Sequence, residues 1–345
     1  MFKRTALNII IVIVLSATTA CTKNVPDPDT GLPAFDNGFF IVNEGNYTWG
    51  NGSLDYFSYD SLYVYPGVFN KIARKVLGDV AMRLSRHENL LYIVVNNSGK
   101  IEVLDLEKKE HHATINGLVS PRDIKIISHN RAIVSSLYSD SLALVDLDAS
   151  LVRDYINIGK SSECILLNDE NIFVSNWSEE NTVTVLSRSD LTLVKSIETA
   201  PEPSEMVSDN NGRVWVICSG GYLNQAYPEL VAIDPVTLEI SKRLTFGKKE
   251  DSPSELVINS AGDTLYYVNG GIFRMSCNAD ELPADPWQPA DGRTFYRLGF
   301  EAQMNAIIAT DALDYVQKGY FYIYTRDGRE QGKYRAGIIP GKIEN

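Results

Sequence analysis

The sequence predicts an all-β fold, a seven-bladed β-propeller whose ring is closed by the C-terminal strand pairing into the N-terminal blade. Three observations predict it: a repeat of 37–50 residues, short alternating strands after each copy, and half of a repeat at each end. Units of this length with about four strands each are typical of propeller blades. An eight-bladed ring and a pair of β-sandwiches are the alternatives.

The first twenty residues have the features of an export signal. Lys3 and Arg4 precede an apolar run over 9–15, which is far shorter than the roughly 20 residues that span a bilayer. Ala20 is followed directly by Cys21, as in bacterial lipoprotein signals. We therefore expect cleavage after residue 20 and acylation of Cys21, with ordinary secretory cleavage as the alternative.

Residues 21–36 are expected to form a flexible tether between Cys21 and a single domain over 37–345. The stretch is polar and contains Pro26-Asp27-Pro28-Asp29, so it cannot build a core. Its early acidic residues resemble the surface-export signal of Bacteroidota lipoproteins. That resemblance implies a lipid anchor in the outer membrane and a domain that faces the cell exterior.

The repeat unit is a small or polar pair, then a polar residue, then apolar residues. Copies begin at residues 77, 121, 161, 203, 253 and 303, and a seventh begins at 340. Each of the first five is followed by an apolar strand, over 91–95, 132–134, 172–174, 214–217 and 265–268. Alternating segments such as 100–105, 141–146 and 229–234 then follow, and their β-branched residues favour strands.

The two ends of the chain complement each other. Residues 38–45 match the second strand of a blade, and no first strand precedes them. The seventh copy, at 340–343, is a first strand with no blade after it. Pairing the two would remove an exposed sheet edge, which is the reason to predict seven blades.

The composition excludes several classes of protein. With 44% hydrophobic and 22% charged residues the chain is neither disordered nor a multi-span membrane protein. Its 32 Lys and Arg against 44 Asp and Glu give a net charge of −12. Nucleic-acid binding needs clustered basic residues, so no nucleic-acid partner is expected.

The polar residue of each repeat is predicted to lie on a ring at the mouth of the central channel. Five carboxylates on one ring would repel each other unless solvated, hydrogen-bonded to nearby backbone or bound to a cation. A structural role for them within their own loops is an equal alternative to ligand binding. The ring consists of Asp79, Asp123, Glu163, Glu205, Glu255, Asn305 and Lys342.

Loops between the second and third strands of the blades are predicted to surround this ring. They carry amides and aromatic side chains, and exposed Tyr and Trp are favoured at binding surfaces. Together they would form a broad, acidic concavity suited to a large ligand with many hydrogen-bonding groups. The candidate ligand-binding residues there are Asn46, Tyr47, Trp49, Asn96, Asn97, Tyr138, Trp177, Tyr222 and Asn269.

Motifs of catalysis are not apparent, so we expect no enzyme and no cofactor. No Ser/His/Asp elbow, phosphate loop or His pair at metal-ligand spacing occurs, and His87, His111, His112 and His129 are expected at the solvated surface. The three cysteines after Cys21 have no metal spacing and are expected as buried thiols, with one disulfide possible. One enzymatic alternative is a lactonase-like metal site that includes Glu205 and Asn305.

Several stretches resemble the YncE-like seven-bladed propeller lipoproteins of Bacteroidota, namely 39–46, 52–54, 91–103, 117–122 and 336–341. That family includes cell-surface cobalamin-binding lipoproteins of the BtuG type. The resemblance implies capture of cobalamin (vitamin B12) or another corrinoid and delivery to a TonB-dependent outer-membrane transporter. A corrin carries rim amides and a cationic cobalt, which suit amide, carboxylate and aromatic side chains. A propeller that binds glycan or a surface protein is the alternative.

Overall fold

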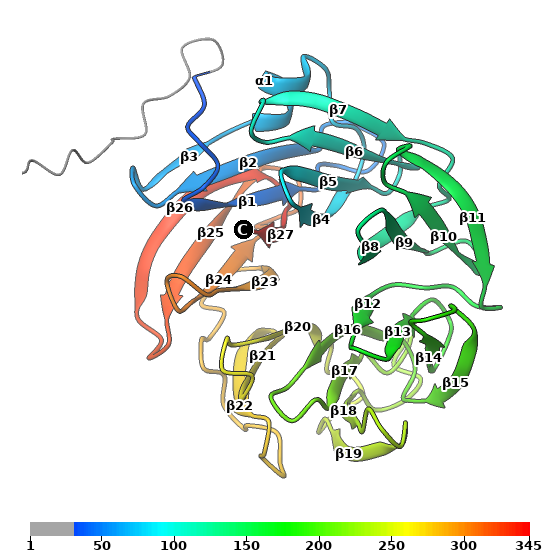
Figure 1. The fold of residues 1–345 in the computed structure, drawn as a ribbon. Helices are drawn as coiled ribbons and strands as arrows, with labels where there is room; N and C mark the ends of the chain where they lie inside the picture. The colour runs from blue at the N-terminus through cyan, green and yellow to red at the C-terminus, as the bar shows by residue number, and fades with distance from the viewer. Residues whose placement is uncertain (1–30) are drawn as a thin grey trace, which may run out of the picture.

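The computed structural model describes residues 31–345, and these form seven β-sheets arranged as blades around a central axis (Figure 1). Six blades have four strands and one has three, and the only helix among the described residues has six residues. The prediction of a seven-bladed β-propeller is therefore confirmed. Signal cleavage, acylation of Cys21 and the tether up to residue 30 lie outside the described residues and stay predictions.

Within each blade the strands are ordered from the central axis outward, and each strand pairs antiparallel with its neighbours. Blade 1 contains β27 (Pro340–Glu344), β1 (Gly38–Asn43), β2 (Ser53–Ser58) and β3 (Tyr63–Tyr65). Helix α1 (Val68–Ala73) leads to blade 2, with β4 (Ala81–His87), β5 (Leu90–Val95), β6 (Lys100–Asp105) and β7 (Glu110–Ile115). Blade 3 contains β8 (Pro121–Ser128), β9 (Arg131–Ser136), β10 (Ser141–Asp146) and β11 (Leu151–Asn157).

The second half of the ring repeats this order. Blade 4 contains β12 (Ile165–Leu167), β13 (Asn171–Asn176), β14 (Thr182–Ser187) and β15 (Leu193–Glu198). Blade 5 contains β16 (Pro203–Ser208), β17 (Val214–Cys218), β18 (Glu229–Ile233) and β19 (Ile240–Thr245). Blade 6 contains β20 (Ser254–Ile258), β21 (Thr264–Asn269) and β22 (Gly271–Ser276). Blade 7 contains β23 (Phe295–Glu301), β24 (Ala306–Asp311), β25 (Lys318–Thr325) and β26 (Glu330–Ile338).

The ring closes as the two half-repeats predict. The last strand, β27, is the inner strand of blade 1 and pairs antiparallel with β1, with Ile41 opposite Ile343 and Phe40 opposite Glu344. The Glu44 amide also donates to the Ile339 carbonyl at 2.9 Å. The inner edge of β1 is thus covered by the end of the same chain (Figure 1).

The core lies between adjacent blades. The middle strands are buried along almost their whole length, as in β5 and β17, because both of their faces pack against a neighbouring blade. Outer strands such as β11 are mostly exposed. Trp215 and Ile217 of blade 5, for example, belong to the same apolar cluster as Tyr267 of blade 6. Alternation on the outer strands and continuous apolar runs inside follow from this arrangement.

Blade 6 departs from the repeat, and this explains the long spacing near residue 303. In place of a fourth strand it has the segment 277–294, in which Gln288 forms a bridge with Ile272 and Trp287 packs on Tyr266. The inner strand of blade 7 then begins at Phe295. The copy predicted at 303–307 is therefore the turn between β23 and β24, not an entry to an inner strand.

The three cysteines among the described residues are buried and form no disulfide. Cys164, Cys218 and Cys277 are free and buried, and burial raises the pKa of the Cys164 and Cys218 thiols to about 12. They behave as small apolar groups rather than as reactive thiolates.

The folded domain begins before residue 37, because Leu32 and Phe35 pack into the core between blades 1 and 2. No helix among residues 31–345 is long and apolar enough to cross a membrane.

Candidate functional site

The mouth of the propeller is the face where the chain enters each inner strand. Near this entry the pairing register shifts in β4, β8, β16, β20, β23 and β27. A bulge of this kind adds a residue to one strand and turns a side chain in a new direction. At or beside these shifts lie the charged residues Arg83, Asp123, Glu205, Glu255, Arg297 and Lys342.

We call these six residues the channel ring, and opposite charges within it are paired. Arg83 of blade 2 binds Glu205 of blade 5, so the pair crosses the ring. Lys342 lies 3.4 Å from Glu205 and also binds Glu255. Arg297 Nη1 donates to Glu255 Oε1 at 2.6 Å. The repulsion expected between the carboxylates is offset by side-chain cations on neighbouring and opposite inner strands, which lie between them.

These cations also control the protonation of the ring. Burial alone would raise the pKa of Glu205, but the nearby Arg83 and Lys342 charges hold it well below its usual range. Burial lowers the pKa of Arg297, but the Tyr296, Glu255 and Glu44 groups beside it raise it well above the usual value. Glu205 and Arg297 are therefore charged at neutral pH, and removing one partner of such a buried pair would leave an uncompensated charge.

Further polar contacts join neighbouring blades at the mouth. Arg122 of blade 3 binds Glu163 of blade 4 in a bidentate pair, with Nη2–Oε1 at 2.8 Å, and its guanidinium lies 5.8 Å from the ring centre of Trp177. Glu44 accepts from the Tyr296 hydroxyl at 2.8 Å and from Arg297 Nη2 at 3.1 Å. The floor of the mouth is thus a rigid, hydrogen-bonded surface.

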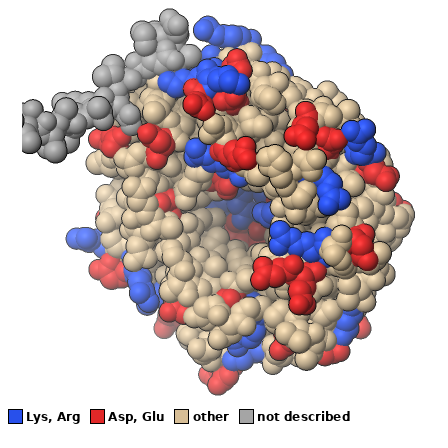
Figure 2. All heavy atoms as spheres, in the orientation of Figure 1, with Lys and Arg blue, Asp and Glu red and all other residues tan. Residues whose placement is uncertain are grey.

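A cavity of about 550 Å³ opens above this floor, a volume typical of small-molecule sites. Two carboxylates in its lining are not neutralised by a basic side chain among the described residues. Glu202 accepts from Ser219 Oγ at 2.7 Å, and Asp251 accepts from the Lys248 amide at 3.0 Å. The cavity therefore keeps negative charge while the channel beneath it is paired. Figure 2 shows basic and acidic side chains together around and inside the central hollow.

Exposed aromatic and apolar side chains stand around this cavity, and we call them the collar. They come from loops of blades 1, 3, 5 and 7, and their exposed fractions reach 76% at Trp49 and 80% at Leu223. Tyr222 and Leu223 also line the cavity itself. The collar consists of Tyr47, Trp49, Tyr138, Tyr222, Leu223, Tyr315 and Val316.

The structure separates the predicted ring into three groups. Glu163, Glu205 and Glu255 line the mouth cavity, and Lys342 lies beside the last two. Asp123 is buried in the channel wall, where it accepts from the Ile165 amide at 3.0 Å, so it secures backbone of the next blade.

Two predicted positions are corrected. Asp79 lies outside the ring, in the loop before β4, where it accepts from the Thr48 amide at 2.9 Å and from the Asn97 side chain. Asn305 lies in the β23–β24 turn on the opposite face, because the segment 277–294 shifts blade 7 along the sequence.

The predicted loop residues all lie on the mouth face, with different roles. Tyr47, Trp49, Tyr138 and Tyr222 are exposed, and Trp177 lines the cavity. The amides mostly hold loops in place and are less free to bind a ligand. Asn46 Nδ2 donates to the Tyr315 carbonyl at 2.7 Å, Asn96 Nδ2 to Ser120 Oγ at 2.9 Å, and the Ser252 amide donates to Asn269 Oδ1 at 3.1 Å.

Sequence reasoning placed Lys342 at the mouth but missed the three arginines there. Arg83 lies four residues after Asp79, and Arg122 lies directly before Asp123. Arg297 lies eight residues before Asn305, the polar residue predicted for blade 7. A detectable signal was present, since basic residues occur at the entry of four inner strands. Their partners could not be read from spacing because each pair joins different blades.

A second depression lies on the outer side of the ring, between blades 1 and 7. It has a volume of about 880 Å³ and exists where β3 is only three residues long. Lys318, Lys333 and Arg335 line it, with Asp55 buried beneath. It shares no lining residue with the mouth cavity, and Tyr63 is the one largely exposed aromatic side chain among its described lining residues, whereas several stand around the mouth, so we place the candidate site at the mouth.

The family model described as a domain of unknown function (DUF5074) matches residues 37–320. The chain belongs to the DUF5074 family. The match begins at the edge of β1 and ends in β25, so it leaves out most of β25, all of β26 and the ring-closing strand β27. No curated protein matches this chain.

Several solved structures share the fold of this DUF5074 protein at low sequence identity. A quinonprotein alcohol dehydrogenase-like protein from Bacteroides thetaiotaomicron VPI-5482 superposes with a TM-score of 0.71 at 13% identity, over 90% of this chain and 78% of that one. A Bacteroides fragilis NCTC 9343 protein, provisionally assigned as a 6-phosphogluconolactonase, gives 0.64 at 11% identity, over 90% and 98%. Kuenenia stuttgartiensis hydrazine synthase gives 0.60 at 12% identity, over 75% and 87%. At these identities the likeness shows the fold alone.

Proposed function

We propose that this protein captures a corrinoid such as cobalamin at the mouth of the propeller, without chemical conversion, and passes it to a TonB-dependent outer-membrane transporter. The observation that carries the proposal is the collar of exposed aromatic side chains around a preorganised polar cavity. Exposed Tyr and Trp side chains, such as Tyr47, Trp49 and Tyr138, favour a role at a binding surface.

The chemistry of the mouth suits a broad ligand that carries amides. The charged side chains of the channel ring pair with one another, so they form the floor of the cavity and are not free to pair with a ligand. Glu202 and Asp251, which have no basic partner among the described residues, are the carboxylates that would face a cationic centre. The role first assigned to Glu205 and Glu255 therefore passes to these two residues.

Binding at the mouth is tested by titrating the full-length protein with cyanocobalamin in a calorimeter. Tyr222→Ala and Trp177→Ala should each weaken binding at least about tenfold, or 1.4 kcal/mol, because aromatic anchors dominate such interfaces. Tyr63→Ala is the matched control, since Tyr63 is an exposed tyrosine of β3 outside the mouth. Absence of saturable heat in the wild type would refute corrinoid capture.

Delivery to a transporter is tested separately in cells. Deleting the gene should lower uptake of labelled cyanocobalamin at limiting concentration and leave uptake at saturating concentration unchanged. Equal uptake at limiting concentration would refute delivery while leaving binding at the mouth intact.

The collar also favours one rival, a propeller that binds glycan or a surface protein. Retention on a glycan array that Tyr222→Ala abolishes, together with no corrinoid binding, would support that rival. The lactonase alternative loses its named ligand pair, because Glu205 lies at the mouth and Asn305 lies on the opposite face.

A further inference from the structure

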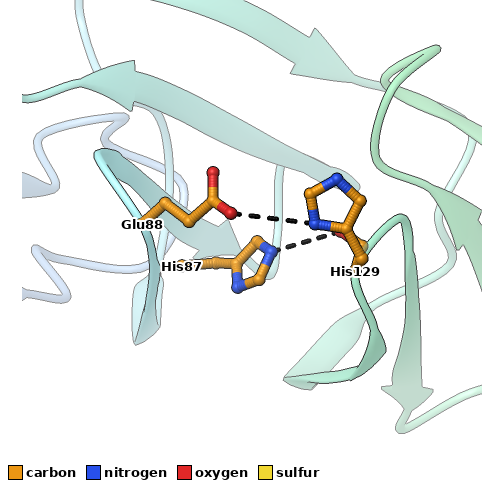
Figure 3. A group of neighbouring side chains, drawn as sticks. All are labelled: His87, Glu88 and His129. Carbon is orange, nitrogen blue, oxygen red and sulfur yellow. Dashed lines mark hydrogen bonds and ion pairs between the residues drawn. The ribbon is translucent and has the colours of Figure 1, made fainter.

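Two histidines and a glutamate meet on the face opposite the mouth, where turns of blades 2 and 3 approach each other. His87 ends β4, Glu88 follows it in the turn, and His129 lies in the turn between β8 and β9. One ligand-type atom from each side chain lies within 4.8 Å of the other two (Figure 3). It is the only such group of three among the described residues.

The cluster is held by contacts between the two blades. The His87 Nε2–H donates to the His129 carbonyl at 3.2 Å, since a carbonyl can only accept. His129 Nδ1 lies 3.7 Å from Glu88 Oε1, and the two imidazole rings are 6.2 Å apart. Glu88 has a left-handed backbone, with φ of 53°. Neither turn could form this cluster alone.

We propose that His87, Glu88 and His129 bind one divalent transition-metal ion, zinc being the best match, which joins blade 2 to blade 3. Two imidazoles and one carboxylate form an established type of zinc ligand set, at about 2.0–2.2 Å from the metal. Imidazole ligands favour zinc, copper or nickel over calcium and magnesium, which take oxygen ligands.

The geometry needs only side-chain movement to reach coordination. Ligands at about 2.0–2.2 Å from a tetrahedral ion are separated by about 3.3 Å, so the donor atoms must close by at most about 1.5 Å. Glu88 and His129 have side-chain exposures of 67% and 80%, which leaves them free to turn. A tetrahedral ion held by these three side chains would keep a fourth position for water.

The spacing of the two histidines explains why sequence reasoning found no metal site. They are 42 residues apart, close to one blade repeat, and so occupy the same turn in successive blades. Motifs of metal ligation are recognised over short spacings, whereas here the propeller itself brings the ligands together.

The proposal is tested with the full-length protein, purified without a polyhistidine tag and titrated with zinc chloride. We expect one zinc per chain and a rise in melting temperature on binding. His87→Ala and His129→Ala should each weaken zinc binding at least about tenfold, because even outer-shell changes at metal sites cost 10–100-fold. Glu88→Gln should weaken it as well, and calcium should give no saturable binding.

His112→Ala is the matched control, because His112 is an exposed histidine of β7 outside the cluster. It should keep both the stoichiometry and the zinc-induced rise in melting temperature. The proposal is overturned if the wild type shows no saturable zinc binding, if the His87→Ala/His129→Ala variant binds zinc as the wild type does, or if His112→Ala loses it equally.

Discussion

Replacing Glu205 with alanine should destabilise the ring strongly. Arg83 and Glu205 have side-chain exposures of only 12% and 8%, and removing one partner of a buried pair costs about 3–5 kcal/mol. Arg83 would lose both of its bonds to Glu205, whereas Lys342 would keep Glu255. We therefore expect a loss near the lower limit, about 3 kcal/mol, measured by urea unfolding at neutral pH.

The matched control is Glu239→Ala, which removes a glutamate paired with Lys195 at the surface. Glu239 is 73% exposed, so its loss should cost less than about 1 kcal/mol. A cycle with Arg83→Ala should show that the double variant is about 1–3 kcal/mol more stable than the two single losses predict. A Glu205→Ala loss below about 1 kcal/mol, or a cycle without coupling, would refute the pairing of the channel charges.

Three further outcomes are expected. Burial opposes ionisation of Glu102, but hydrogen bonds from Lys100, Lys75, Thr114 and His111 lower its pKa to about 2. The ionised Glu102 therefore stabilises the fold above the unfolded pKa near 4.5, and this stabilisation is lost as the pH falls toward 2. Glu102→Gln should flatten the acid side of a profile of unfolding free energy against pH by up to about 3 kcal/mol. Gly299→Ala would place a methyl group 2.2 Å from Ile343 Cγ1 and should cost about 1–3 kcal/mol in thermal or urea unfolding, whereas Gly247→Ala, with no atom within 4 Å, should change little. Deleting residues 340–345 should cost more than about 4 kcal/mol, because it uncovers β1; a deletion variant that melts like the wild type would contradict ring closure by β27.

The blades were predictable because their signal is repeated. Each unit alone is a weak pattern, but several copies at similar spacing, with complementary halves at 38–45 and 340–343, specify the number of blades and the closure. The prediction was wrong at 303–307, where the segment 277–294 replaces a strand and changes the phase of the repeat. A turn before β24 then resembles the entry of an inner strand.

The site was predictable only in its location. The repeat identified which face carries the polar residues, and Glu163, Glu205 and Glu255 do lie there. The register of a bulge decides which residue points inward, and a shift of one residue exchanges the two faces of a strand. Local patterns therefore could not show that Arg83 crosses the ring to Glu205, or that His129 meets His87.

Because β27 closes the ring, the propeller can be completed only after this strand has been synthesised. Ile41 pairs with Ile343, about three hundred positions later, so one edge of β1 stays unpaired until residues 340–344 have been synthesised. Contacts of such long sequence separation form slowly, and open strand edges promote association between chains. A nascent chain is thus most vulnerable to aggregation before β27 has been synthesised. A variant that lacks β27 would keep the open edge of β1 permanently.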